Sequence, residues 1–326
     1  MNRAHLGLGN GCQNLPSPLG LVAAGTEFAC KAKQSARSVL FVQPLERVMK
    51  QQLFQRLFIL ACAVMLAGCA STMDCPSVLP NASYTGPYKG VDNKLSVADL
   101  GRDLQCAQNF KTSKYPGGFV AIYGSSRIGE ASRLPDPALA RQSEALYADV
   151  MAFAEAWTRR HGKQYPVMTG AGPGLMEAGN RGALLAGGPS IGYTTYYDPA
   201  PRGDANKVFW KYKGQDLITD GLIFSSVGIR EYAMFLHSAA IVIGPGGTGT
   251  EWELFQILEM TKSDQLQPVP IYLVGNKEVH WKSFYDRLDD MVRRGTVRQG
   301  EVTKHLEHVE RAVDLVPLLE KRLGLP

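Results

Sequence analysis

Residues 240–262, AIVIGPGGTGTEWELFQILEMTK, contain the change of pattern that decides the fold. The stretch opens with apolar residues, continues through a glycine-rich turn at 244–249, and ends with the composition of a helix. An apolar run that ends in glycines and leads directly into a helix is typical of a buried parallel strand and the crossover helix that follows it. The stretch therefore predicts one β-α unit of a layered α/β domain.

The same alternation extends along most of the chain. We expect strands at 119–126, 166–172, 190–197, 220–228, 240–247 and 269–275, and helices at about 96–110, 137–161, 174–187, 230–239, 249–262, 281–295 and 308–323. Strands this uniformly apolar are buried on both faces, which indicates a parallel sheet between two layers of helices, closed by the strand at 269–275. We predict a single α/β domain with a doubly wound, mostly parallel, Rossmann-like sheet.

Residues 49–68 have the pattern of a secretory signal peptide. Lys50 and Arg56 flank the start of the segment, and the apolar run 57–67 is too short to cross about 30 Å of hydrocarbon. The sequence Leu-Ala-Gly-Cys that ends at Cys69 resembles the lipobox of bacterial lipoproteins, in which this cysteine is lipidated after the signal is removed. The resemblance implies a periplasmic, outer-membrane lipoprotein, because Ala70 follows the cysteine. A buried helix that ends in Gly-Cys is the alternative.

The rest of the chain divides around this signal. We interpret residues 1–48 as the product of a misassigned start, with Met49 as the true initiator; a disordered cytoplasmic extension is the alternative. Residues 69–95 are rich in Pro, Gly, Ser and Asn and predict a tether, and 96–326 form the folded domain. Cys75 and Cys106 remain after processing, and both a disulfide and two free thiols are compatible with the sequence.

Charge and metal-ligand spacing argue against two classes of function. The formal net charge of +5 resides entirely in residues 1–68, and the remainder is neutral, which excludes a basic surface for nucleic acid. Cys and His residues form no cluster with zinc spacing, so we predict no metal. His305 and His308 are expected on the solvated surface of a charged helical tail.

Glycine-rich segments follow three of the expected strands, at 123–127, 169–174 and 244–250. Glycine allows a ligand to approach main-chain N–H groups, and a helix that starts directly afterwards favours an anion such as phosphate. Tight β-α turns also use glycine for structural reasons, but three such loops at one sheet edge favour a phosphate pocket. The segments match neither the dinucleotide fingerprint nor the Walker phosphate loop, so NAD binding and ATP hydrolysis are disfavoured.

Together and in order, these segments resemble the LOG family, the cytokinin riboside 5′-monophosphate phosphoribohydrolases that are often labelled lysine decarboxylase-like. The motif P-G-G-x-G-T-x-x-E is present at 245–253, and an Arg four residues before a Met on the preceding helix matches Arg230 and Met234. The segment 169–183 matches T-G-G-G-P-G-x-M-E-A-x-N-x-G-A with Ala171 in place of one Gly. The resemblance covers about residues 117–295.

This resemblance implies hydrolysis of the N-glycosidic bond of a nucleoside 5′-monophosphate, without a cofactor, by a homodimer. It places Arg230 and Glu253 in the catalytic pair; a structural salt bridge between them is the alternative. A carboxylate near the ribose stabilises the positive charge that develops as the C1′–N bond breaks. The expected substrate-binding positions are Gly124, Ser125, Ser126, Arg127, Gly170, Gly172, Gly174, Glu177, Asn180, Gly246, Gly247, Thr248, Gly249 and Thr250.

Several positions carry two interpretations. Glu177 and Asn180 either line the nucleotide site or serve as capping and surface residues. Ser225 and Ser226 either contact ligand or satisfy backbone groups, and the tyrosines at 193, 196 and 197 either stack on a base or pack in the sheet. Relatives often carry Lys at the position of Glu231 and Glu at that of Trp252, so cytokinin nucleotides are not implied specifically.

Two other functions compete with hydrolysis. A binding protein would capture a nucleotide or a related phosphate without turnover, although it would not need both Arg230 and Glu253. A lysine decarboxylase would require pyridoxal phosphate and a Schiff-base lysine, and no lysine of the mature chain lies in a motif that can be connected to that cofactor.

Overall fold

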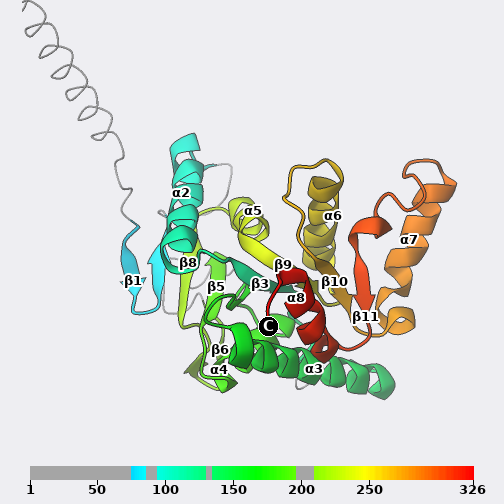
Figure 1. Ribbon diagram of the computed structural model, residues 1–326, viewed down its shortest axis with the longest axis horizontal. Helices are drawn as coiled ribbons and strands as arrows, with labels where there is room; N and C mark the ends of the chain where they lie inside the picture. The colour runs from blue at the N-terminus through cyan, green and yellow to red at the C-terminus, as the bar shows by residue number, and fades with distance from the viewer. Residues whose placement is uncertain (1–74, 86–93, 130–133, 196–208) are drawn as a thin grey trace, which may run out of the picture. The chain divides into compact units, whose positions relative to one another are not determined.

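The computed structural model describes residues 75–85, 94–129, 134–195 and 209–326 (Figure 1). These ranges fall within one folded unit, residues 71–326. The expected extension at 1–48, the signal peptide at 49–68, the lipidation site Cys69, and Tyr196 and Tyr197 lie outside the described residues. Within the described part of the chain, no helix is long and apolar enough to cross a membrane.

A nine-stranded sheet forms the centre of this unit, in the order β1-β2-β8-β5-β4-β3-β9-β10-β11. Its strands are β1 (Ser77–Leu79), β2 (Ala82–Tyr84), β3 (Phe119–Tyr123), β4 (Val167–Thr169), β5 (Ser190–Thr195), β8 (Asp220–Phe224), β9 (Ser238–Ile243), β10 (Ile271–Val274) and β11 (Glu307–Val309). Neighbouring strands pair in parallel except β1 and β2, which are antiparallel. This confirms the predicted doubly wound, mostly parallel α/β fold.

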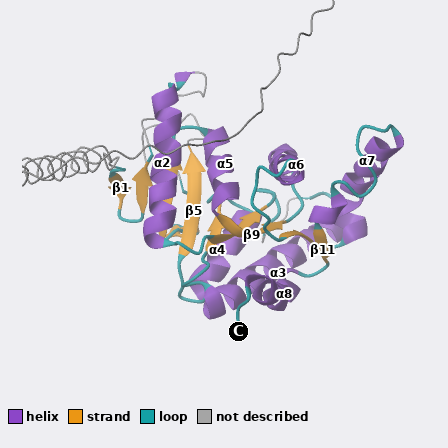
Figure 2. Cartoon of the chain, turned by 45° about the horizontal axis from the view of Figure 1, so that its top comes forward, coloured by secondary structure: helices purple, strands orange, loops and turns teal. Residues whose placement is uncertain are grey.

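Helices cover both faces of the sheet (Figures 1 and 2). One face carries α2 (Val97–Lys114), α5 (Val227–His237), α6 (Thr248–Lys262) and α7 (Lys282–Arg293). The other carries α3 (Pro137–His161), α4 (Leu175–Leu185) and α8 (Leu315–Leu323). Short π and 3-10 turns lie at Lys277–Trp281, Thr303–His305 and Ala312–Asp314, and a separate two-stranded hairpin is formed by β6 (Lys211–Tyr212) and β7 (Gln215–Asp216).

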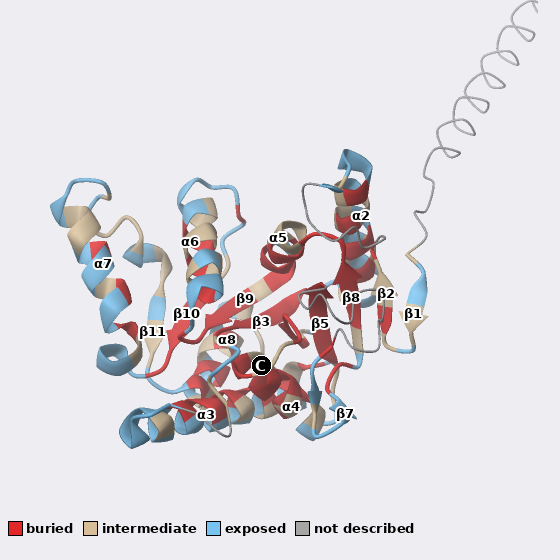
Figure 3. Cartoon of the chain, turned by 180° about the vertical axis from the view of Figure 1, so that it is seen from behind, coloured by how far each residue is buried: buried red, intermediate tan, exposed pale blue. Residues whose placement is uncertain are grey.

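The central strand β3 shows why apolar runs build this architecture. Its side chains alternate, so that Phe119 and Tyr123 pack among α2, α5 and α6 while Val120 and Ile122 pack against α3 and α4. Both sets are almost completely buried, and Figure 3 shows the central strands β3, β5, β8 and β9 as mostly buried. A strand with helices on both faces needs apolar residues at every position, which is the pattern seen in the sequence.

Both edges of the sheet differ from the prediction. The segment 69–95 was expected to be a tether, but β1 and β2 lie within it and extend the sheet beyond β8. The strand expected at 269–275, which is β10, was to close the sheet. Instead β11 pairs outside it, so the start of the expected helix 308–323 is a strand. These edge strands have three residues each and half-exposed side chains, so they lack the apolar run that marks a central strand.

The two histidines of the C-terminal region are also not simply solvated. His308 lies on β11, and its Nε2 is 2.7 Å from the carbonyl oxygen of Gly275. His305 lies in the short turn before that strand and is partly buried. Both rings therefore pack against the edge of the domain, because β11 brings them back onto the sheet.

A disulfide joins Cys75, just before β1, to Cys106 in the middle of α2, with Cα atoms 5.9 Å apart. The sequence was compatible with a disulfide or with two free thiols, and the structure has the disulfide. The bond closes a loop with a sequence separation of 31 residues and fastens the edge strands to α2. Cys106 itself is fully buried, whereas Cys75 is partly exposed.

Replacing Cys75 by Ser is expected to lower the free energy of unfolding by about 4 kcal/mol, since a cross-link around a loop of this size restricts the unfolded chain to that extent. Urea unfolding of the purified protein, with and without dithiothreitol, measures the effect. The wild type should become as unstable as Cys75→Ser in the reductant, and Cys75→Ser should not respond to it. Equal stability of the oxidised wild type and the variant would contradict the prediction.

Candidate functional site

The site lies where β3, β4 and β9 end. β3 is flanked by β4 on one side and β9 on the other, so the direction in which the chain builds the sheet reverses beside β3. In open α/β sheets the loops diverge at such a reversal, and ligands bind in the crevice at the carboxyl ends of the strands. The three glycine-rich segments follow these three strands, and the structure brings them together there.

Main-chain hydrogen bonds connect the three loops. The Ser125 N–H donates to the carbonyl oxygen of Pro245 over 3.1 Å, and the Leu175 N–H donates to the carbonyl oxygen of Ser125 over 3.0 Å. Gly174 has a φ of +72°, and a Cβ atom there would lie 2.2 Å from that same Ser125 oxygen. Only glycine fits this position, so Gly174 allows the first and second loops to come into contact.

A cavity of about 830 Å³ opens between the loops, a size suited to a small organic ligand. The expected site residues that line it are Gly124, Ser125, Ser126, Arg127, Gly170, Gly172, Arg230, Gly247, Thr248, Gly249, Thr250 and Glu253. Gly174, Glu177, Asn180 and Gly246 were also expected there, but they do not line the cavity. Gly246 packs against Thr250 at the start of α6, where a Cβ atom would meet the threonine side chain.

The first turn of α6 faces this cavity. Its N-cap residue is Gly247, which offers no side-chain oxygen, and the next three residues, Thr248, Gly249 and Thr250, also line the pocket. Helix α4 likewise begins at a glycine without a side-chain cap, whereas the Ser226 hydroxyl caps α5. Uncapped N–H groups at the start of a helix, together with its dipole, favour an anion. This part of the pocket suits a phosphate group.

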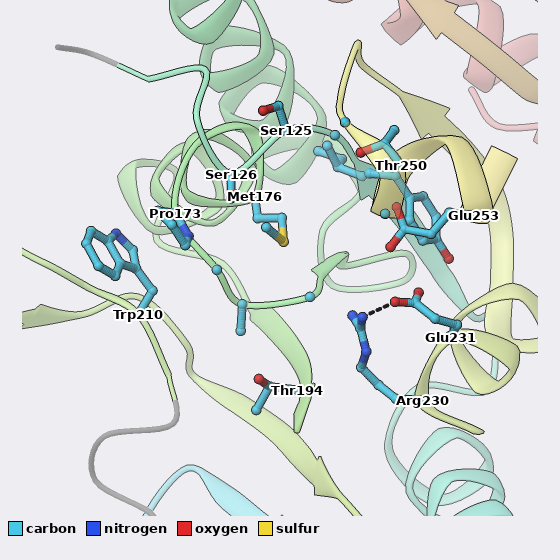
Figure 4. A pocket seen from close by; sticks show the side chains of 18 of the residues that line it. Ser125, Ser126, Pro173, Met176, Thr194, Trp210, Arg230, Glu231, Thr250 and Glu253 are labelled. Carbon is cyan, nitrogen blue, oxygen red and sulfur yellow. Dashed lines mark hydrogen bonds and ion pairs between the residues drawn. The ribbon is translucent and has the colours of Figure 1, made fainter. Parts of the chain in front are cut away.

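Arg230 and its neighbour Glu231 both come from α5 and form a buried ion pair (Figure 4). The Arg230 guanidinium also donates to the sulfur of Met234 over 3.4 Å. A Cβ atom at Gly170 would lie 2.7 Å from Arg230 Nη1, so the bare backbone of the second loop makes room for this guanidinium. The salt bridge that we considered between Arg230 and Glu253 is thus made, in this structure, by Arg230 and Glu231.

Asp103 fixes the start of α5. Its carboxylate accepts hydrogen bonds from the N–H groups of Ser225 and Ser226, at 3.1 and 2.9 Å, and from the Thr85 hydroxyl. Burial raises the pKa of this carboxyl group, while the three hydrogen bonds act in the opposite direction. Ser225 and Ser226 do not line the cavity; they belong to the structural support of the helix that carries Arg230.

Glu253 lies on α6, one turn beyond Gly249, and lines the pocket on the same side as Arg230 and Glu231 (Figure 4). Burial raises the pKa of its carboxyl group to about 7, and the positive charge of Arg230 offsets part of that rise. The negative charge of Glu253 in turn contributes to a raised pKa of the buried Tyr123, after burial itself. A carboxyl group with a pKa near neutrality is suited to proton transfer or charge stabilisation at neutral pH.

Other expected site residues serve the fold. Asn180 is buried on α4, accepts from the Thr169 hydroxyl over 2.6 Å and donates to the Ser190 hydroxyl over 2.9 Å, so it connects β4 and β5 and does not line the cavity. Tyr193 is buried in the sheet, with its hydroxyl 3.1 Å from His237 Nδ1. Its packing role is confirmed and its role in base stacking is excluded by this burial.

The pocket also contains residues that were not among the expected site residues. Thr194 and Trp210 lie outside the family motifs, whereas Met176 is part of the motif at 169–183. All three line the pocket, and Figure 4 shows Trp210 on the side opposite the charged residues. Trp210 lies in a segment between β5 and β8 that has no glycine-rich motif, so only an aromatic residue in a polar loop could have drawn attention to it. Trp252, noted in the sequence, lines the pocket from α6 and is 45% exposed.

Ala171 stands where the resembling motif has glycine, and the structure explains the motif's preference. Its φ is +56°, in the left-handed region that costs a residue with a side chain roughly 1–2 kcal/mol. Its carbonyl oxygen accepts from the Trp210 N–H over 3.0 Å. The second loop therefore adopts the conformation expected of glycine, with some backbone strain at this position.

These observations can now be compared with known proteins. Residues 176–319 match the family model described as "Possible lysine decarboxylase". The match includes all but the first residue of α4, Arg230, the third glycine-rich loop and Glu253, and it supports the family resemblance seen in the motifs. None of the curated proteins matches the chain.

Solved structures also resemble this one. They include the molybdenum cofactor binding protein from the phototrophic bacterium Rippkaea orientalis, 15% identical, and the molybdenum cofactor carrier protein from Chlamydomonas reinhardtii, 18% identical. The first match covers 63% of this chain and 97% of the other, the second 64% and 98%, and both have a TM-score of 0.41. A protein designated TM1055 is 15% identical with the same TM-score, over 63% of this chain and 99% of that one.

The described residues of the pocket do not fit the cofactor that the family description suggests. Pyridoxal phosphate enzymes hold the cofactor through a Schiff-base lysine. Among the described residues that line the pocket, none is a lysine, and its cationic side chains are those of Arg127 and Arg230. We therefore derive no decarboxylation chemistry for this site.

Proposed function

We propose that this protein hydrolyses the N-glycosidic bond of a nucleoside 5′-monophosphate, releasing the free base and ribose 5-phosphate. The observation that carries the proposal is the position of Glu253. This carboxyl group has a raised pKa, is influenced by the charge of Arg230, and shares a ligand-sized cavity with the uncapped start of α6. The family resemblance supports the same class of reaction. Phosphate recognition and a carboxylate are the two elements that this reaction requires in one pocket.

Each group in the pocket has a separate role in the proposed reaction. The N–H groups at the start of α6 hold the 5′-phosphate, which fixes the ribose near Glu253. The C1′–N bond breaks with its electron pair moving to the base nitrogen, which takes up a proton, and water adds to C1′ and loses one. The Glu253 carboxylate stabilises the positive charge that develops on the sugar or accepts the proton of the attacking water. Either role requires the ionised form of Glu253.

The experiment is to incubate the purified protein with AMP, GMP, CMP and UMP and to separate the products by chromatography. Equal amounts of free base and ribose 5-phosphate from at least one nucleotide are expected. The corresponding nucleosides serve as a matched control, since without a phosphate they lack the group that α6 binds and should react at least about tenfold more slowly. Phosphate release with the base still attached, or no reaction with any nucleotide, would overturn the proposal.

A second candidate is a nucleotide-binding protein without turnover, and the Arg230–Glu231 ion pair favours it. Glu231 neutralises the guanidinium that the resemblance assigns to catalysis, and both side chains are buried. Isothermal titration calorimetry with the same nucleotides separates the two candidates. Tight binding without any base release would establish the binding protein.

A further inference from the structure

Trp210 forms part of the pocket wall across from the charged residues (Figure 4). Trp210 is 43% exposed, a high fraction for a large aromatic residue that lines a cavity. Pro173 and Met176 line the pocket between Trp210 and the opposite wall. The cavity thus has a charged wall made by Arg230 and Glu253, and an apolar wall that ends in an indole ring.

The indole ring is held in place by Glu177, which does not line the cavity, and the Trp210 backbone is held by Ala171, which does. The indole Nε1–H donates to Glu177 Oε2 over 2.5 Å, and the Trp210 backbone N–H donates to the Ala171 carbonyl oxygen. The ring is therefore fixed to α4 by its edge, and its backbone is fixed to the second loop. An aromatic ring anchored by its polar edge leaves its apolar faces for contact with another molecule.

Glu177 is itself held by a cluster on α3 and α4. Its other carboxylate oxygen, Oε1, accepts a hydrogen bond from the Tyr147 hydroxyl over 2.5 Å. The same oxygen lies 3.8 Å from Arg181 Nη1. Arg181 donates to the same Tyr147 hydroxyl over 2.7 Å and lies 3.7 Å from the centre of the Tyr212 ring on β6. Glu177 is buried behind the pocket wall, so these contacts position Trp210 without reaching the ligand.

We propose that Trp210 binds the base of the nucleotide by stacking, and that Glu177 is the residue that positions it. The inference rests on the proposed function, since it concerns the same pocket. The start of α6 and Glu253 take the phosphate and sugar, which leaves the apolar wall for the one flat, uncharged part of the ligand. Indole stacks on the flat face of a base, so this wall binds the base of the nucleotide.

The test compares the affinities of AMP and ribose 5-phosphate, because the second ligand lacks only the base. Trp210→Ala is expected to weaken AMP binding by about tenfold or more and to leave ribose 5-phosphate binding within about twofold. Trp210→Phe should retain most of the AMP affinity, since it keeps an aromatic face. Circular dichroism and thermal unfolding check that each variant is folded, and Trp210→Phe provides the comparison if the alanine variant is not.

Trp252→Ala is the matched comparison, because Trp252 is a second exposed indole at the same pocket. If that variant loses AMP selectively and Trp210→Ala does not, the proposal is overturned. It is also overturned if both ligands weaken equally in Trp210→Ala. These outcomes leave the proposed hydrolysis standing, whereas AMP that binds but is not cleaved contradicts the hydrolysis and not the subsite. A wild type that binds neither ligand overturns both.

Glu177 has a separate readout. Glu177→Ala should lower AMP affinity by severalfold with little change for ribose 5-phosphate, because the indole loses its anchor. Glu177→Gln keeps an oxygen that accepts from the indole N–H and should restore the preference for AMP. A purely structural role would lower both affinities in parallel, and this result would contradict the positioning role.

Discussion

Replacing Glu253 by Gln is expected to slow base release by about 10²- to 10⁴-fold while leaving the protein at least as stable as the wild type near pH 8. Gln has nearly the same shape but carries no negative charge, so it cannot stabilise the developing positive charge on the sugar or accept a proton from water. Initial rates with the preferred nucleotide and urea unfolding of both proteins measure the two effects. A fall in activity together with a gain in stability is the signature of a residue retained for function.

The pH dependence follows from the raised pKa of Glu253. Burial raises this pKa from an ordinary value of 4.5 to about 7, so between these values the folded protein keeps a proton that the unfolded chain has released. The stabilising contribution of that proton is complete below pH 4.5 and is lost as the pH rises through 7. Glu253→Gln should therefore match the wild type in stability near pH 4 and exceed it at pH 8. The activity of the wild type should rise with pH through about 7.

Glu259→Gln is the control for these experiments. Glu259 lies on the same helix, forms an exposed ion pair with Lys262 and does not line the pocket. This variant should retain activity within about twofold and should show no gain in stability at pH 8. If Glu253→Gln retains more than a tenth of the wild-type activity, Glu253 does not have the role that we propose.

The second large effect concerns the buried pair of Arg230 and Glu231. Glu231→Ala is expected to lower the free energy of unfolding by about 3–5 kcal/mol, because it removes the buried carboxylate that pairs with the Arg230 guanidinium. Inorganic phosphate should recover part of the loss, since an anion in the pocket would take the place of the carboxylate. Urea unfolding with and without phosphate measures both changes.

A double variant distinguishes the cost of a broken pair from a loss of packing. Arg230→Met with Glu231→Leu removes both charges and fills a similar volume, so its stability should lie within about 1 kcal/mol of the wild type. The double variant should nevertheless be inactive, because Arg230 is gone. If Glu231→Ala costs less than about 1 kcal/mol, the pair does not stabilise α5 as the structure implies.

The sequence predicted the centre of the molecule well because local patterns are sufficient there. Strands that are buried on both faces must be apolar throughout, so β3, β4, β5, β8, β9 and β10 were visible as apolar runs. It predicted the edges poorly, since β1, β2 and β11 are short, half-exposed strands that pair through their backbones. Pairing of this kind depends on a neighbouring strand, and no side-chain pattern records it.

The site divides in the same way. The glycine spacing at 123–127, 169–174 and 244–250 determined where the pocket forms, because parallel strands deliver the loops that follow them to one edge. Glu177 and Asn180 occupy motif positions, yet neither lines the pocket. Glu177 binds the indole of Trp210 from behind the pocket wall, and Asn180 binds side chains of the strands β4 and β5. The direction of each side chain on α4 depends on its neighbours in space, so the motif alone could not separate a ligand contact from a support.

What the sequence by itself determined is therefore the doubly wound fold, the sheet edge at which the pocket lies, and the candidate pair Arg230 and Glu253. The lipid anchor on Cys69 stays a prediction from the sequence. The tertiary structure alone decided that Glu231 takes the guanidinium of Arg230 and that burial brings the pKa of Glu253 near neutrality. Only the tertiary structure shows that Trp210 lines the pocket and that Glu177 holds its indole ring. The physical reason is that periodicity and turn chemistry are local, whereas ion pairing, burial and the packing of one ring against a distant helix arise only when the chain folds.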